Sequence, residues 1–147
     1  MNYIHILKKL PYSEPFLFVD QLEHLDENGV EGNFTFSEKL DFYRGHFLGN
    51  PVTPGVILTE CCAQIGLVCL GLYLLGESKD LKNNFVLFSS EMEFYLPVYP
   101  GEKVSVSSKK IYFRFHKLKC AVKMFNGQGK MVCKGIISGM IKTSGDG

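Results

Sequence analysis

The residues best suited to acid–base chemistry lie together in one stretch of the chain, residues 42–64, which reads FYRGHFLGNPVTPGVILTECCAQ. His46 stands there among glycines and prolines, and Glu60 follows inside an apolar run. A histidine exchanges a proton near neutral pH, and a carboxyl in apolar surroundings keeps its proton more readily than in water. The pair therefore has the residue types of a general base and a general acid.

The same stretch offers a set of hydrogen-bond donors. Its glycines and prolines predict a loop of fixed shape that leads into a long helix. Gly55 opens that helix, so its backbone N–H has no partner within the helix and suits a carbonyl oxygen or a developing oxyanion. A base, an acid and such donors are the groups that β-elimination of water from a 3-hydroxyacyl thioester requires.

Each of these residues also has an ordinary structural interpretation. A single loop histidine often serves only packing or hydrogen bonding, and a lone glutamate in an apolar helix is often a satisfied polar group. A Pro-Gly pair can begin any helix. Spacing alone therefore leaves both interpretations open.

The surrounding sequence predicts two strands, one long helix and then four strands. We expect the strands at residues 16–25, 30–37, 84–96, 103–115, 119–125 and 130–141, with turns at 26–29 and 126–129 and an antiparallel meander at the end. The helix at 56–75 is apolar nearly all round, so a sheet should cover most of its faces. The prediction is a single α+β domain over residues 1–147, with one helix against an antiparallel sheet.

Composition excludes several classes of protein. The 147 residues are 46% hydrophobic and 21% charged, which is typical of a globular domain and not of a disordered or fibrous chain. A net charge of +1 gives no broad surface for nucleic acid. The run 56–75 is long enough for a membrane span, but Glu60 and Gln64 lie one turn apart in it, and we expect no membrane span.

The cysteines predict a reducing compartment. The chain has five, Cys61, Cys62, Cys69, Cys120 and Cys133, and no CxxC spacing of the kind that binds zinc. We interpret them as reduced thiols packed like small hydrophobic residues. The N-terminus shows no secretory signal pattern, so a cytoplasmic protein is expected.

Three stretches resemble the β-hydroxyacyl-[acyl carrier protein] dehydratases of the FabZ type. GHFLGNPVTPGVILTECCAQ resembles the signature GHFPxxPxxPGVLxxExxAQ, LPYSEPFLFVDQL resembles LPHRxPFLLVDRV, and FYLPVYPGEKV resembles FRRPVxPGDxL. The resemblance covers most of the chain from Leu10 onward. It implies a hot-dog fold, in which an antiparallel sheet wraps one long central helix. It also implies dehydration of 3-hydroxyacyl-[acyl carrier protein] to the trans-2-enoyl product, without metal or cofactor.

The resemblance also implies a role for particular residues. His46 matches the catalytic histidine, Glu60 the catalytic acid, and Gly55 the glycine whose N–H binds the thioester carbonyl. A glutamate at position 60 favours the FabZ branch over the isomerising FabA branch, which has aspartate. The family's histidine faces the acid of a partner subunit, so a homodimer is implied and a trimer of dimers is compatible with it. Four further residues are expected in the acyl tunnel or at the carrier-docking surface: Phe47, Val56, Gln64 and Arg44.

The chain departs from the family pattern at three places. Leu48 replaces a proline, Tyr12-Ser13 replaces His-Arg, and Tyr95-Leu96 replaces a basic pair. Basic residues near a tunnel mouth attract an acidic carrier protein, so other cations should take over that task. The candidates are Arg44, Lys103, Lys109, Lys110 and Arg114.

Two alternative functions remain open at this stage. One is a hot-dog acyl thioesterase, with Glu60 as base or nucleophile. The other is a non-catalytic hot-dog subunit that binds acyl chains. The presence of both His46 and Glu60 in register favours the dehydratase over either alternative.

Overall fold

The computed structural model describes residues 3–76 and 84–142, in which one antiparallel sheet surrounds a long helix. Two strands, a helix and four strands follow one another, as the sequence predicts. In chain order the elements are α1 (Ile4–Leu7), β1 (Gln21–Asp26), β2 (Gly29–Thr35), η1 (Asp41–Arg44), α2 (Gly55–Ala63), η2 (Gln64–Cys69), α3 (Leu70–Leu75), β3 (Asn84–Phe94), β4 (Lys103–Arg114), β5 (Lys117–Phe125) and β6 (Met131–Lys142).

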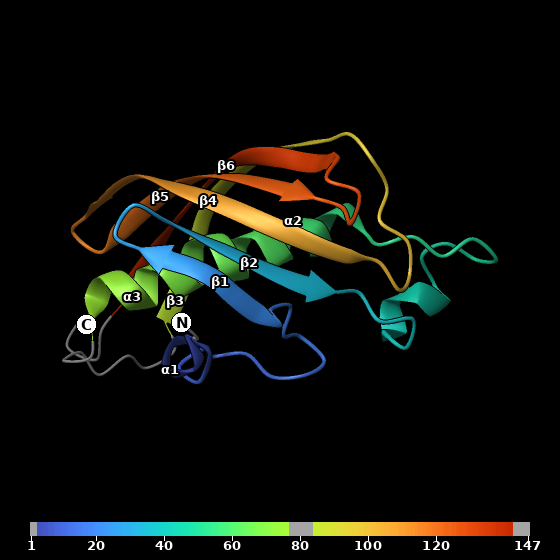
Figure 1. Cartoon of the computed structure of the whole chain (residues 1–147), viewed down its shortest axis with the longest axis horizontal. Helices are drawn as coiled ribbons and strands as arrows, with labels where there is room; N and C mark the ends of the chain where they lie inside the picture. The colour runs from blue at the N-terminus through green and yellow to red at the C-terminus, as the bar shows by residue number, and fades with distance from the viewer. Residues whose placement is uncertain (1–2, 77–83, 143–147) are drawn as a thin grey trace.

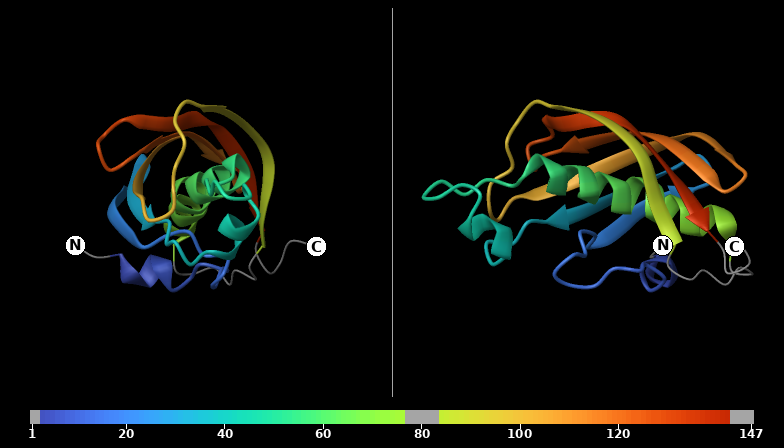
Figure 2. Two further views of the ribbon diagram at one scale, coloured as in Figure 1. Left: turned by 90° about the vertical axis from the view of Figure 1, so that its right-hand side faces the viewer. Right: turned by 180° about the vertical axis from the view of Figure 1, so that it is seen from behind.

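The strands lie in the order β1-β2-β4-β5-β6-β3, and the sheet curls around the helix (Figures 1 and 2). The predicted meander is correct for β4, β5 and β6. It is wrong for β3, which pairs with β6 at one edge, while β4 pairs with β2. The reason is the long helix, which crosses the inner face of the sheet and delivers the chain to the edge opposite β1. This is the hot-dog arrangement that the sequence predicts.

The helix is the core of the protein. Its segments α2, η2 and α3 follow one another without a break, and η2 has the wider π-helical form. Cys61, Ile65 and Leu70 are fully buried, and a buried isoleucine or leucine side chain contributes about 1.5–3 kcal/mol by leaving water. The stretch Gly55–Leu75 could span a membrane by length and composition, but 72% of its most apolar window is buried inside the fold. It is therefore placed as a core helix, as predicted.

Close packing between helix and sheet depends on Gly66. A Cβ at this position would lie 2.9 Å from Cγ1 of Val122 and 3.0 Å from Cβ of Ser108, so any side chain there would force these neighbours to shift. The Ser108 hydroxyl donates a hydrogen bond of 2.8 Å to the carbonyl oxygen of Gly66. Ser108 thus fastens the π-helical segment, and the Glu60 turn before it, to the centre of the sheet.

The cysteines are packed as predicted. All five are buried and none forms a disulfide in the described part of the chain. A hydrogen bond between the thiols of Cys62 and Cys133 raises the pKa of Cys62 and lowers that of Cys133. Burial raises the pKa of Cys61 well above its ordinary value, so this thiol stays protonated at neutral pH.

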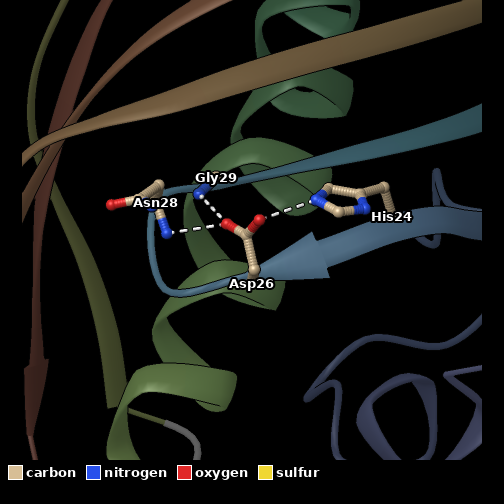
Figure 3. A network of polar contacts seen from close by, with 4 residues as sticks. All are labelled: His24, Asp26, Asn28 and Gly29. Atoms are coloured by element: carbon tan, nitrogen blue, oxygen red, sulfur yellow. Dashed lines mark hydrogen bonds and ion pairs between the residues drawn. The ribbon is translucent and has the colours of Figure 1, made fainter.

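The turn between β1 and β2 is held by Asp26 (Figure 3). Its Oδ1 accepts hydrogen bonds from the backbone N–H groups of Asn28 (2.8 Å) and Gly29 (3.1 Å), and its Oδ2 lies 2.7 Å from Nε2 of His24. The bond to His24 is the main reason that the pKa of Asp26 is lowered. The predicted turn at residues 26–29 is confirmed.

The first strand begins later than predicted, at Gln21 and not at residue 16. Residues 16–18 lie against the helix, and their backbone bonds to helix side chains: the Phe18 N–H donates to Oε1 of Gln64, and the Phe16 carbonyl accepts from Nε2 of Gln64. An apolar run read from sequence alone does not distinguish a strand from a segment that packs on a helix.

Candidate functional site

His46 lies in the loop between η1 and α2, which extends beyond one end of the sheet (Figure 1). His46 and Val52 close the base of this loop. The backbone N–H of Val52 donates to the carbonyl oxygen of His46 (2.8 Å), and Nδ1 of His46 lies 2.9 Å from the carbonyl oxygen of Val52. A carbonyl oxygen can only accept, so Nδ1 carries the hydrogen. In its neutral form His46 therefore keeps a free electron pair on Nε2.

The loop leads directly into the helix. The first helical hydrogen bonds run from the N–H groups of Ile57 and Leu58 to the carbonyl oxygen of Pro54. The N–H groups of Gly55 and Val56 precede these bonds and stand at the positive end of the helix dipole. Beside them is a cavity of about 300 Å³, lined by Thr53, Gly55, Leu58 and residues 94–97.

Glu60 lies one turn further along α2 and lines a different cavity, of about 240 Å³. The lining is mainly apolar: Tyr12, Phe16, Glu60, Ala63, Leu67, Val68, Phe85, Val86, Leu87, Gly139, Met140 and Ile141. Burial raises the pKa of the Glu60 carboxyl, and a hydrogen bond of 3.0 Å from Nε2 of Gln64 opposes that rise. The raised pKa suits a group that must hold a proton near neutral pH.

The other expected site residues differ in exposure. Phe47 is 56% exposed and stacks on the His46 ring, with centroids 4.0 Å apart. Val56 is 76% exposed on the first helical turn. Gln64 is fully buried and does not line the Glu60 cavity. Arg44 is exposed, and its Nη2 lies 3.5 Å from Oδ1 of Asp41.

The described part of a single chain does not bring the base and the acid together. No hydrogen bond or ion pair joins His46 to Glu60 there, and His46 lines neither of the two cavities described above. The acid faces the edge of the sheet where β3 lies, and the loop with the base projects at the end of the helix. Among the described residues, His46 and Glu60 therefore belong to separate surroundings.

Tyr12 lies close to Glu60. From the sequence, Tyr12 was noted only as a departure from a family motif and not as a site residue. Its hydroxyl group has a pKa raised to about 12, mainly by burial and then by the charge of Glu60. Tyr12 and Glu60 line the same cavity. The two residues are 48 positions apart in the chain, so spacing gave no signal that they share a cavity.

The near-zero net charge conceals an uneven distribution of basic and acidic residues along the chain. Residues 103–145 contain ten lysines and arginines and no acidic residue. Residues 1–102 contain six lysines and arginines and fourteen acidic residues. None of the nine cations from Lys103 to Lys134 forms an ion pair in the described part of the chain. The strands β4 to β6 are therefore strongly basic.

Cys, His, Asp and Glu form no cluster of three suited to a metal ion among the described residues, and the absence of a metal stays a prediction.

Residues 10–138 match the model of the FabA-like domain family. The chain belongs to this family. It is 34% identical to the 3-hydroxyacyl-[acyl-carrier-protein] dehydratase FabZ of Caldicellulosiruptor bescii, over 96% of this chain and 99% of that protein. It is 36% identical to the enzyme of the same name from Wolbachia pipientis, over 81% and 83% of the two chains. The resemblance read from the motifs is confirmed.

Solved structures agree on the fold. The dehydratase heterocomplex ApeI:P from Xenorhabdus doucetiae superposes with a TM-score of 0.79, at 12% identity over 96% of this chain and 93% of that one. A thioesterase from Streptococcus pneumoniae, solved with coenzyme A, gives 0.61 at 14% identity, over 84% and 85%. Identities this low carry the fold and not the reaction, so the hot-dog architecture is what these two neighbours establish.

Proposed function

We propose that this FabA-like protein dehydrates 3-hydroxyacyl-[acyl carrier protein] to the trans-2-enoyl thioester in fatty-acid biosynthesis or a related lipid pathway. The observation that carries the proposal is the match, along almost the whole chain, to dehydratases named for this reaction. The lone pair on Nε2 of His46 and the raised pKa of Glu60 supply the chemistry that the reaction needs.

The reaction begins at the base. Nε2 of His46 removes a proton from the carbon next to the thioester carbonyl, and the bond from Nδ1 to Val52 holds the ring during the transfer. Negative charge then develops on the thioester oxygen. The N–H of Gly55, at the start of the helix, stabilises that charge.

Glu60 completes the elimination. Its proton moves to the 3-hydroxyl group, the C–O bond breaks, and water leaves as the double bond forms. The step leaves a protonated His46 and an ionised Glu60. Return of the proton from the imidazolium to the carboxylate, through solvent, restores both groups for the next turnover.

The site is completed by a second copy of the chain, with His46 of one subunit facing Glu60 of the other. The separate positions of base and acid support this arrangement. So does the edge strand β3, on which Val86, Leu87 and Phe88 are 43–49% exposed. An exposed apolar edge strand in a folded protein calls for a partner. We propose a homodimer with two equivalent sites, and a trimer of dimers is compatible with it.

The acyl group enters the apolar cavity beside Glu60, while its carrier stays outside. An acidic carrier protein complements the basic strands β4 to β6 and Arg44. Five buried, unpaired thiols suit a reducing cytoplasm.

The test is a direct assay. Purified protein is incubated with a 3-hydroxyacyl-[acyl carrier protein], and formation of the conjugated enoyl thioester is followed by its ultraviolet absorbance. A thiol reagent added in parallel detects any free carrier thiol, which would identify a thioesterase. Enoyl product without thiol release supports the dehydratase. Thiol release without enoyl product, or neither, would overturn it.

A further inference from the structure

Gln64 has an unusual position for a polar side chain. It is fully buried in the middle of an apolar helix, yet every polar atom of its amide has a partner. Its Oε1 accepts from the Phe18 N–H at 2.8 Å. Its Nε2 donates to the Phe16 carbonyl at 3.0 Å and to Oε2 of Glu60 at 3.0 Å. A buried amide that is fully satisfied holds one orientation, because any rotation would leave a polar atom unpaired.

These partners also determine which end of the amide faces Glu60. A backbone N–H can only donate, so the atom of Gln64 that faces Phe18 must be the oxygen. The nitrogen therefore faces Glu60, and Oε2 of Glu60 is an acceptor. The carbonyl oxygen of a protonated carboxyl is the better acceptor, so the acid hydrogen resides on Oε1.

We propose that Gln64 is the positioning residue of the acid: it fixes Oε2 of Glu60 and leaves Oε1 to carry the transferred proton. This inference rests on the proposed function, in which Glu60 is the proton donor. Gln64 itself touches no reacting atom. Through Phe16, which lines the cavity beside Glu60, it also fixes the acid relative to the cavity wall.

Two other titratable groups interact electrostatically with Glu60, and neither changes charge near neutral pH. The pKa of the Tyr12 hydroxyl is about 12, and burial raises the pKa of the Cys61 thiol well above its ordinary value. The hydrogen bond from Gln64 lowers the pKa of Glu60, against the effect of burial. Removing that donor should therefore raise the pKa of Glu60.

The first experiment uses the wild-type protein and no substrate. The carboxyl carbon of Glu60 and the side-chain amide of Gln64 are followed by NMR as pH is varied. We expect the Gln64 amide resonances to move with the same midpoint as the Glu60 carboxyl. A Gln64 amide that stays constant through the Glu60 titration would overturn the proposal. Because no turnover is needed, this result is independent of whether the protein dehydrates its substrate.

The second experiment compares variants. Gln64→Met keeps the size of the side chain and removes the donor, so kcat should fall about 10-fold to 100-fold, with KM within about twofold. The pH at which activity is lost on the alkaline side should rise, because Glu60 keeps its proton longer. Gln64→Glu keeps the acceptor for Phe18 and serves if Gln64→Met does not fold; the same upward shift is expected.

Cys61→Ala is the matched control. The Cys61 thiol donates to the Phe18 carbonyl at 3.4 Å, so this change also removes a bond between the helix and residues 16–18 but keeps the hydrogen bond from Gln64 to Glu60. Cys61→Ala should lower thermal stability without changing the pH at which activity is lost on the alkaline side. Two results would show that Gln64 has only a structural role. In one, Cys61→Ala shifts the pH of alkaline activity loss as far as a Gln64 variant does. In the other, the Gln64 variants do not shift it.

Discussion

The two ends of the candidate site are built in opposite ways. Glu60 is part-buried on α2, one turn from a fully buried Gln64, and lines a mainly apolar cavity. His46 lies in a loop that extends beyond the sheet, and its ring is held by Val52 and stacked on a half-exposed Phe47. The acid is held by a side chain of its own helix and lines a cavity, whereas the base is held by the backbone of a projecting loop.

This difference bears on the proposal that a second subunit completes the site. A catalytic imidazole must be shielded from water if charge next to it is to be stabilised strongly. Exposed apolar side chains lie near the loop and along β3, and a second subunit that covered them would also cover His46. A part-buried base in a projecting loop, with an acid that lines a separate cavity, fits one subunit of the proposed shared site.

Removing the side-chain function of either His46 or Glu60 should have the largest effect on the dehydration rate. His46→Ala and Glu60→Gln should each lower the dehydration rate by at least about 100-fold, the usual contribution of a positioned base or acid. The measurement is kcat/KM with a 3-hydroxyacyl thioester. His24→Ala and Glu31→Gln, at exposed positions on β1 and β2, should retain wild-type rates. Retained turnover in both His46→Ala and Glu60→Gln would remove these residues from the mechanism.

Mixing the two inactive variants tests whether the site is shared. If His46 and Glu60 come from different subunits, a mixed dimer has one site with both groups and one with neither. Random exchange of subunits should then restore about a quarter of wild-type activity, since half of the dimers are mixed. Each variant alone, taken through the same unfolding and refolding, is the control. A mixture as inactive as its components, or an active monomer by sedimentation, would place base and acid in one chain.

The contrast between acid and base was only partly readable from sequence. Glycine, proline and histidine spacing predicts the loop and the helix start because these residues act locally on the backbone. Two other features of the site join segments that are distant in the chain: the cavity shared by Tyr12 and Glu60, and the hydrogen bonds of Gln64 to residues 16 and 18. The pairing of β3 with β6 was missed for the same reason: alternation identifies a strand but not its neighbour.

Carrier recognition should give a smaller effect, at the exposed end. Exposed charges are screened over about 8–10 Å near physiological ionic strength. Turnover of a carrier-linked substrate should therefore fall as salt rises, while that of a small uncharged thioester should barely respond. Arg44→Glu should raise KM for the carrier substrate several-fold and leave kcat near wild type. Its stability should also change little, because the exposed pair with Asp41 contributes little. Equal salt dependence for both substrates would contradict charge-guided docking.

The smallest effect concerns the contribution of Glu60 to the stability of the fold. The pKa of Glu60 is raised in the folded protein, so folding disfavours its ionised form. Below the ordinary carboxyl pKa both the folded and the unfolded chain hold the proton, and ionisation has no effect on the free energy of unfolding. As pH rises through the raised pKa, the unfolded chain has already lost this proton and the folded chain is destabilised.

Glu60→Gln does not titrate and still accepts from Gln64. Its melting temperature should equal that of the wild type at low pH and exceed it at neutral pH, as thermal melts across that range would record. Glu31→Gln, which removes an exposed carboxylate, should follow the wild-type curve. A Glu60→Gln protein that is less stable than wild type at neutral pH would mean that the acid is held in its ionised form, and the contrast between the two ends of the site would lose its basis.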